Sequence, residues 1–234
     1  MNAGRTARDR ARAEVAQEIK DEARRHLVTE GAHGLSLRAV SRSLGVASSA
    51  LYRYFPSRDD LLTALIIDAY DAMGAAAEHA DSEIRKGRGK SADSTGEAEP
   101  RDRWLAVCRA VRTWAVNHRH EYELIYGSPV PGYEAPKDTV APATRVPLLL
   151  TAIATAGKVE DSSIGHGLRS QLSSVIGMNS IDLPPGALAR VMVAWTQLFG
   201  VISFELFGQL VGSADPADDF FDFSAAAMAD FVGL

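Results

Sequence analysis

The stretch SLRAVSRSLGVASSALYRYFPSRDDLL, residues 36–62, predicts two short helices that meet at a tight turn. Val40 and Leu44 lie one helical turn apart before the central Gly-Val pair, and Leu51 and Tyr54 lie one turn apart after it. The glycine of that pair can take the left-handed backbone conformation that a sharp turn between helices needs. This spacing is typical of a helix-turn-helix, a motif that presents its second helix to the major groove of DNA.

The second of these helices carries small and polar residues at the end that the motif inserts into the groove. Ser48, Ser49, Ala50 and Arg53 are expected to point outward, while Val46 is expected to fill the corner between the helices. The N-terminal end of a recognition helix is the part that contacts base edges. We therefore interpret this segment as one that reads DNA.

The same string resembles the DNA-binding domain of TetR-family transcriptional regulators, over about residues 14–65. The resemblance rests on GAHGLSLR (31–38), Gly45-Val46, LYRYF (51–55) and SRDDLL (57–62). The sequence departs from the family pattern at Ser41, where alanine is usual, at ASSA (47–50), which replaces Ser-x-Gly-Thr, and at Arg53, where histidine is frequent. Because these positions touch or neighbour bases, the resemblance does not transfer an operator sequence to this chain.

The side chains of the segment have the chemistry that such contacts need. Arg53 can donate to guanine or to phosphate, the Tyr52 hydroxyl can reach a phosphate, and Arg58 is expected to clamp one. Taken singly, the tyrosines could be ordinary core or rim aromatics and the arginines a solvated face, but their agreement in register favours DNA binding. The predicted DNA-contacting residues are Ser36, Arg38, Ala47, Ser48, Ser49, Ala50, Tyr52, Arg53, Tyr54 and Arg58, with a flexible basic arm of Arg5, Arg8, Arg10 and Arg12.

The charge distribution agrees with a DNA-binding N-terminal part. The 234 residues carry a net charge of −5, but residues 1–58 hold eleven Lys and Arg against six Asp and Glu, and the remainder holds 14 against 24. A basic head on an acidic protein indicates that only the head meets a polyanion, although chance asymmetry is the alternative. The single cysteine excludes a disulfide framework and fits a reducing cytoplasm. Neither a secretory signal nor a membrane span is expected.

The rest of the chain predicts helices almost throughout, and hence an all-α fold. Val15, Ile19, Ala23 and Leu27 recur at four-residue spacing and predict one buried stripe on the first helix. The expected helices cover 8–30, 36–44, 48–54, 59–86, 101–126 with a possible kink near 117–120, 143–157, 163–178, 185–211 and 216 to the C-terminus, with loops at 87–100 and 127–142. We expect a three-helix DNA-binding domain at 1–58 and a larger helical domain at 59–234.

The resemblance implies that this larger domain senses a ligand and dimerises. A small, largely apolar or aromatic effector needs a pocket lined mainly by apolar side chains with few polar groups. The alternative is that the same residues simply fill the core. The candidate ligand-binding residues are Trp104, Cys108, Trp114, His118, Tyr122, Tyr126, Met178, Trp195 and Phe199.

The last two predicted helices are the candidates for the dimer interface. The segment VMVAWTQLFGVISFELFGQLVG (191–212) is apolar on nearly all sides, and FFDF (220–223) places three phenylalanines within four residues. A helix that is hydrophobic all round is buried, either inside one chain or against a second copy. The candidate interface residues are Val191, Phe204, Phe207, Phe220, Phe223 and Met228.

Signals for an enzyme are weak. The segment GRGKS (87–91) ends like a phosphate loop, but Ile84 stands where the first glycine is required. His118 and His120 would diverge on a helix, so no metal site is predicted. We find no nucleophile motif and expect no cofactor.

The leading hypothesis is a homodimeric transcriptional repressor that binds a palindromic double-stranded DNA operator and is released by a small-molecule effector. The alternative is a helical small-molecule binding protein or enzyme without sequence-specific DNA binding. Steep salt dependence of DNA binding would favour the first hypothesis.

Overall fold

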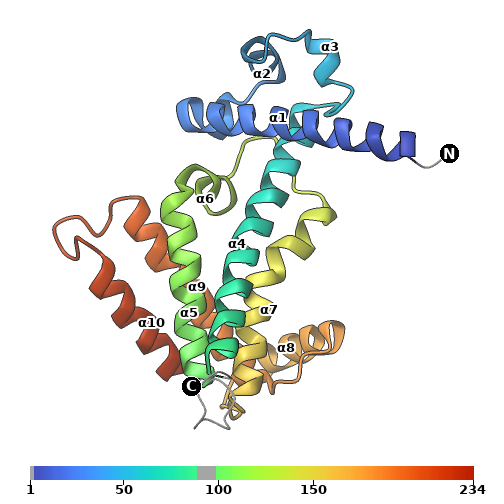
Figure 1. Ribbon diagram of the computed structural model, residues 1–234. Helices are drawn as coiled ribbons and strands as arrows, with labels where there is room; N and C mark the ends of the chain where they lie inside the picture. The colour runs from blue at the N-terminus through green and yellow to red at the C-terminus, as the bar shows by residue number, and fades with distance from the viewer. Residues whose placement is uncertain (1–2, 89–98) are drawn as a thin grey trace. The chain divides into compact units, whose positions relative to one another are not determined.

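The computed structural model describes residues 3–88 and 99–234, and those residues form helices connected by turns, without a β-strand. The predicted all-α fold is therefore confirmed (Figure 1). In chain order the helices are α1 (Ala3–Gly34), α2 (Leu37–Ser43), α3 (Ser48–Leu51), α4 (Arg58–Arg88), α5 (Pro100–Asn117), α6 (Arg119–Tyr126), the 3-10 helix η1 (Lys137–Thr139), α7 (Val140–Ala156), α8 (His166–Asn179), α9 (Pro185–Leu206) and α10 (Asp218–Val232).

The helices gather into two compact units. Unit 1 comprises Met1–Tyr70 and His118–Val140, and unit 2 comprises Asp71–Asn117 and Ala141–Leu234. The unit that holds the predicted DNA-binding domain thus extends beyond residue 58, because it also contains the first turns of α4 and the whole of α6, which packs on α1. Helix α4 begins in unit 1 and ends in unit 2.

The core of unit 1 is built from α1 and the inner faces of α2, α3 and α4. Ile19, Ala23 and Leu27 are buried, as the four-residue spacing predicts. Val15 is exposed, so the predicted stripe begins one turn later than expected. The other apolar residues buried in this core are Leu35, Leu37, Val40, Leu51, Leu61, Leu62, Leu65, Ile66 and Val130.

Glycines at positive φ make two sharp bends in the helix-turn-helix part of unit 1. Gly45 (φ 68°) lies in the turn between α2 and α3, as predicted, and Gly31 (φ 67°) breaks the helical backbone near the end of α1. Val46 does not fill the corner: 44% of it is exposed, and Leu44 packs against the core instead. Leu44 alone fills the corner between α2 and α3, because the backbone turn at Gly45 directs the Val46 side chain outward.

A reciprocal cap starts α4. The backbone N–H of Asp60 donates to Ser57 Oγ at 3.1 Å, and Ser57 Oγ donates to Asp60 Oδ2 at 2.7 Å. The Asp60 N–H, one of the backbone donors of the first turn without a helical partner, is satisfied in this way. Asp59 and Asp60 also place negative charge at the positive end of the helix dipole.

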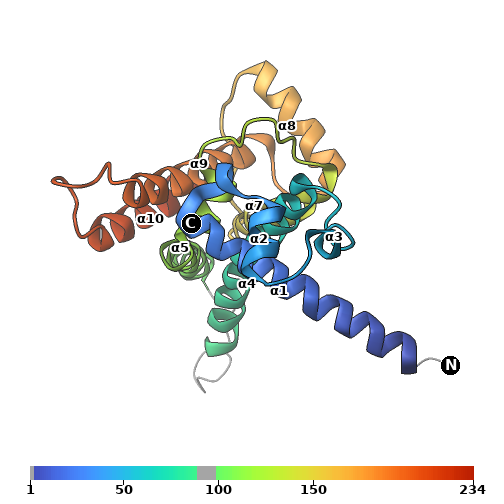
Figure 2. The ribbon, with the colours of Figure 1, turned by 90° about the horizontal axis from the view of Figure 1, so that it is seen from above.

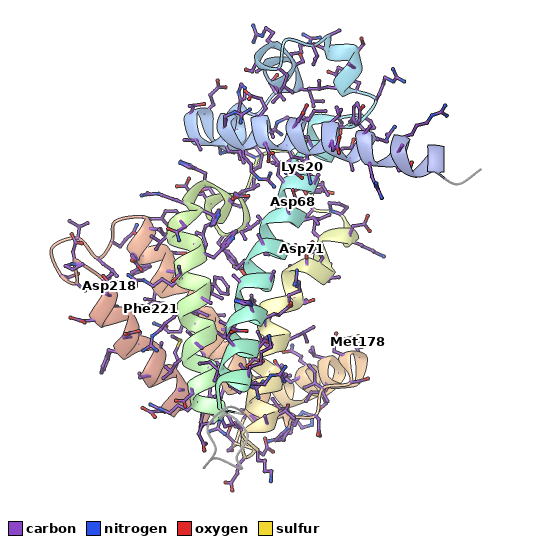
Figure 3. The ribbon with its side chains drawn as sticks, in the orientation of Figure 1. Lys20, Asp68, Asp71, Met178, Asp218 and Phe221 are labelled. Atoms are coloured by element: carbon purple, nitrogen blue, oxygen red, sulfur yellow. The ribbon has the colours of Figure 1, made fainter. Side chains whose placement is uncertain are left out.

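In unit 2, Arg112 of α5 holds α9 and α10. Its Nε and Nη2 donate to Glu205 at 2.7 and 2.6 Å, and its Nη1 donates to Asp218 at 3.0 Å. The guanidinium also lies over the ring of Phe221, 5.0 Å from its centre (Figure 3 labels Asp218 and Phe221). The hydrogen bonds to Glu205 raise the pKa of Arg112, so this fork stays charged.

A second arginine holds α7 against α4 in unit 2. Arg145 donates to the backbone carbonyl of Asp71 at 2.9 Å, to its carboxylate at 2.8 Å, and to both oxygens of Glu78 at 2.9 and 2.6 Å. A Cβ at Gly74 would lie 2.8–2.9 Å from Arg145 atoms. A glycine inside a helix is unfavourable by about 0.5–1 kcal/mol relative to alanine. The close approach of Arg145 explains why a glycine stands at position 74 of α4 despite this cost.

Several helix ends differ from the predictions. Helix α3 ends at Leu51 and passes into turns, and the expected 101–126 helix is broken at His118, whose φ and ψ are −127° and 46°. Helix α9 ends at Leu206 because Gly208 takes φ 81° soon afterwards. Helix α7 begins at Val140, three residues early, and residues 89–98 of the expected 87–100 loop lie outside the described residues.

Two segments of the described chain, Lys137–Ala156 and Pro185–Leu206, are long and apolar enough to cross a membrane by length and composition. A core helix of a soluble protein passes the same test. The length and composition of these two helices are therefore weak evidence for a membrane span, because both segments place part of their apolar surface inside the protein.

Candidate DNA interface and sensor residues

The two helices of the predicted helix-turn-helix are joined by a pair of serines. Ser41 is buried on α2, and its Oγ lies 2.8 Å from Ser48 Oγ at the start of α3. Ser41 Oγ also donates to the carbonyl of Arg38 at 3.0 Å, which makes Ser48 the donor to Ser41. Ser41 therefore orients Ser48, and both serines stand at positions where this sequence departs from the family pattern.

We expect Ser41→Ala to lower the free energy of unfolding by about 1 kcal/mol, because it removes a hydrogen bond that joins α2 to α3. Urea unfolding followed by circular dichroism measures this change. The matched control is Ser49→Ala, because Ser49 is exposed and should change stability by less than about 0.5 kcal/mol. Equal stability losses in both variants would contradict the assigned role of the serine pair.

The structure leaves one face of this motif open to solvent. Tyr52 is 44% exposed, and Arg38, Ala47, Ser49 and Arg53 are exposed as well. The predicted contacts Ser36, Ser48, Ala50 and Tyr54 are half-buried at its edge. Ser36 is the N-cap of α2 but its side chain makes no capping hydrogen bond. The exposed side chains at the start of α3, Ala47 and Ser49, are small, and those just after its end, Tyr52 and Arg53, are long and carry polar groups.

Arg58 has a different role from the predicted phosphate clamp. Its Nε donates to the carbonyl of Leu35 at 3.0 Å and its Nη2 donates to that of Ala32 at 2.8 Å. Both carbonyls follow the break in α1, where the backbone lacks helical partners. The guanidinium therefore closes the connection between α1 and α2, a role that sequence spacing does not show, and a phosphate contact of Arg58 stays a prediction.

The predicted basic arm is helical rather than flexible. Helix α1 begins at Ala3, so the arginines at 5, 8, 10 and 12 belong to it. Arg8, Arg10 and Arg12 are exposed. Alanine and arginine, which are good helix formers, make up most of residues 3–12 and favour continuation of α1 towards the N-terminus.

An ionic network joins α1, α4 and α6 within unit 1. Lys20 and Arg24 of α1 contact Asp68 of α4 at 2.7 and 2.6 Å, and Arg24 also contacts Glu121 of α6 at 2.9 Å. Figure 3 shows Lys20 and Asp68 close together. These partly buried charges anchor α6 to the helices that carry the DNA-binding motif. The sequence analysis missed this network, because its members are 44 to 97 positions apart.

The candidate ligand-binding residues are divided between the two units. Tyr122 and Tyr126 belong to unit 1, where their rings stack at 5.2 Å and Tyr70 meets Tyr126 edge-on at 6.1 Å. His118 is an exposed residue of the same unit. The break at His118 ends the helical stripe that was expected to continue from Trp114.

The other candidates belong to unit 2. Trp104 and Cys108 are fully buried, Trp114 and Phe199 are 6% exposed, and Trp195 meets Phe199 edge-to-face at 6.3 Å. Burial raises the pKa of the Cys108 thiol to about 12, so it stays protonated and is a poor metal ligand. Nε1 of both Trp104 and Trp195 is buried without an acceptor among the described residues.

Met178 does not line a core. It is 77% exposed near the end of α8 (Figure 3), and Leu172 is the residue of that helix that is buried. Contact of Met178 with an effector therefore stays a prediction that the burial of α8 does not support.

The candidate dimer residues divide into an outer and an inner set. Phe204, Phe207, Phe220 and Phe223 are exposed, whereas Val191 and Met228 are buried within unit 2. Between α9 and α10 lies an open apolar groove of about 320 Å³. It is lined by Val193, Ala194, Gln197, Phe220, Phe223, Ser224, Ala227, Met228 and Phe231.

Within residues 3–88 and 99–234, no three His, Cys, Asp or Glu side chains are grouped so that they could hold a metal ion.

An exposed helix-turn-helix in one unit and a second all-helical unit in the same chain define a helical DNA-binding regulator. Residues 19–65 match the family described as bacterial regulatory proteins, tetR family, and residues 104–228 match the one described as tetracyclin repressor-like, C-terminal domain. The chain belongs to the TetR family of transcriptional regulators, which confirms the resemblance seen in the sequence.

The chain has relatives of the same kind over most of its length. HTH-type transcriptional regulator Rv1816 of Mycobacterium tuberculosis is 38% identical over 206 residues, which cover 85% of this chain and 83% of the relative. Among solved structures, the regulatory protein SCO4313 is 32% identical, with a TM-score of 0.78 and coverage of 95% and 98%. The TetR family transcriptional regulator PfmR from Thermus thermophilus, 17% identical with a TM-score of 0.52 over 92% and 96% of the two chains, shares the fold alone.

Proposed function

We propose that this TetR-family chain is a cytoplasmic, ligand-responsive repressor that binds a palindromic operator as a homodimer. In this proposal, a small, largely apolar or aromatic effector releases the DNA. The observation that carries it is the exposed recognition surface at the end of α3. Tyr52 and Arg53 are both exposed there, on a motif whose own core is closed by Val40 and Leu51. Such donors suit phosphate and guanine.

Homodimer formation is supported by the apolar surface of α9 and α10. Phe204 is 55% exposed and Phe223 is 71% exposed, and both flank buried positions of the same helices. Exposed apolar patches with this density of aromatic side chains are typical of protein interfaces. A dimer would also present two recognition helices to the two halves of a palindrome.

The effector class is inferred from the aromatic residues inside unit 2. Trp104 is fully buried, Trp195 meets Phe199 edge-to-face, and the indole N–H groups of Trp104 and Trp195 lack acceptors among the described residues. A buried donor without a partner is costly, so a bound molecule that supplies an acceptor would be favoured. We therefore propose an aromatic or apolar effector that carries at least one hydrogen-bond acceptor.

Helix α4 is the proposed connection between effector binding and DNA release. It is one continuous helix that contains residues of both units, and Arg145 holds it at Gly74, one turn beyond Tyr70. An effector that binds one arrangement of α4 more tightly than another would shift the population toward the arrangement it prefers. The change in operator affinity is limited by that difference in effector affinity.

The test is a fluorescence anisotropy titration of the native chain with double-stranded DNA from the flank of its own gene and with unrelated DNA of equal length. We expect tight binding to the flanking DNA, two protomers per duplex, and a steep fall in affinity with rising salt, because phosphate contacts release counterions. Equal, salt-insensitive binding to both DNAs would favour the alternative of a helical small-molecule binding protein or enzyme.

The dimer is tested with Phe223→Glu, by sedimentation velocity without DNA and by the same anisotropy titration with DNA. We expect a charge at this 71% exposed position of α10 to shift the sedimentation coefficient to that of a monomer and to weaken operator binding at least about tenfold, since a buried charge at an interface costs several kcal/mol. Val116→Glu is the matched control, because Val116 is an exposed valine of α5. A Phe223→Glu variant that remains dimeric would contradict the proposed interface.

A further inference from the structure

The N-terminal half of α1 lacks a core of its own. Residues 7–15 are all exposed, and Ile19 is the first buried residue within 7–34. Figures 1 and 2 both show this end of α1 extending past α2 and α3. A helix without an apolar face is held in place only by the side-chain contacts that it makes.

Arg12 makes such a contact with the end of the recognition helix. Its Nη2 donates to the backbone carbonyl of Arg53 at 3.0 Å, and its guanidinium carbon lies 5.2 Å from the centre of the Tyr54 ring. The Arg53 carbonyl lies just after Leu51, where α3 ends and the last carbonyls lack helical partners. A positive charge is also favourable at that end of the helix dipole.

The two contacts of Arg12 fall on Arg53 and on the residue after it, next to the side chains proposed to read DNA. Tyr52 and Arg53 lie between the end of α3 and Tyr54, in a segment of turns rather than helix. The turn itself is closed by the Arg53 and Tyr54 amides, which donate to Ala50 and Leu51 at 3.3 and 2.8 Å. Tyr54 and Phe55 pack against the core of unit 1, whereas Tyr52 and Arg53 are exposed, so the contact of Arg12 with the Arg53 carbonyl adds an anchor on the exposed side of the turn.

We propose that Arg12 is a positioning residue for DNA reading: it fixes the segment 52–54 so that Tyr52 and Arg53 meet the operator in one orientation. The inference rests on the proposed operator binding and deepens it. Arg12 thus contributes to the discrimination between operator and other DNA, whereas a simple phosphate contact would strengthen binding to all DNA alike.

The test compares Arg12→Ala and Arg12→Lys with Arg8→Ala, which removes the same charge one helical turn away from an exposed position. Affinity is measured by anisotropy for the operator and for an operator with substituted half-sites, at several salt concentrations. We expect Arg12→Ala to weaken operator binding roughly tenfold while binding to substituted DNA falls only as much as in Arg8→Ala, since a hydrogen bond and a cation–π contact are lost. Arg12→Lys keeps the charge without the planar fork and should lose discrimination too.

A measurement without DNA checks the same role. Hydrogen exchange of the 52–54 amides should speed up in Arg12→Ala and remain at the native rate in Arg8→Ala, because only the first variant releases the turn. The inference would be overturned if Arg12→Ala and Arg8→Ala lost equal affinity for both DNAs and hydrogen exchange of the 52–54 amides stayed unchanged. Arg12 would then contribute only a positive charge that strengthens binding to all DNA. Failure of the native chain to prefer its operator would instead overturn the proposed function, while the exchange result would still report whether Arg12 holds the turn.

Discussion

Operator binding is expected to fall at least about 100-fold in the double variant Tyr52→Ala, Arg53→Ala, because each good side-chain contact with DNA contributes about 1–3 kcal/mol and the variant removes two from every half-site. Both side chains are exposed, so their loss removes contact groups without opening the core. Arg12 donates to the backbone carbonyl of Arg53, a group that the substitution keeps. Anisotropy titration with the operator measures the loss.

The control for this variant is its own stability together with an unrelated charge removal. The free energy of unfolding should stay within about 0.5 kcal/mol of the native value, as is usual for exposed positions. Lys86→Ala removes an exposed charge of α4 in unit 2 and should leave the operator affinity within about twofold, because it lies outside the proposed interface. If the double variant kept native affinity, the exposed end of α3 would not be the DNA-reading surface.

Unit 2 is expected to lose about 3–5 kcal/mol of unfolding free energy when Arg103 is replaced by methionine, since the change leaves a buried carboxylate without its partner. Asp81 of α4 and Arg103 of α5 are joined by two hydrogen bonds of 2.6 and 3.2 Å, and their side chains are 5% and 10% exposed. Arg85 lies 3.5 Å from Asp81 but is 61% exposed, so it replaces little of the lost interaction. Urea unfolding of the whole chain provides the measurement.

Arg109→Met is the matched control on the same helix. Arg109 contacts Asp222 at 2.8 Å, but both side chains are more than half exposed, so this pair should contribute less than about 1 kcal/mol. The double variant Asp81→Leu, Arg103→Met should be more stable than Arg103→Met alone, because it removes the stranded charge as well. If Arg103→Met and Arg109→Met lowered the free energy of unfolding by similar amounts, burial would not explain the contribution of the Asp81–Arg103 pair to stability.

Local patterns in the sequence determined the helices, the turn and the family. The four-residue spacing of Ile19, Ala23 and Leu27 predicts their burial, and Gly45 predicts the turn, because period and backbone conformation depend on neighbouring residues. The sequence indicates the break at His118 only as a kink near 117–120, and helix ends are where local signals compete most closely.

Only the tertiary structure decided which long side chains meet. Arg58 turns to backbone carbonyls rather than outward, Arg12 lies on Tyr54, and Met178 stays in solvent. It also decided which of the apolar residues on α9 and α10 face the core, since both helices are apolar on most sides. The physical reason is that a helix period fixes the direction of Cβ, whereas the partner of an arginine four or five bonds further out depends on distances across the fold.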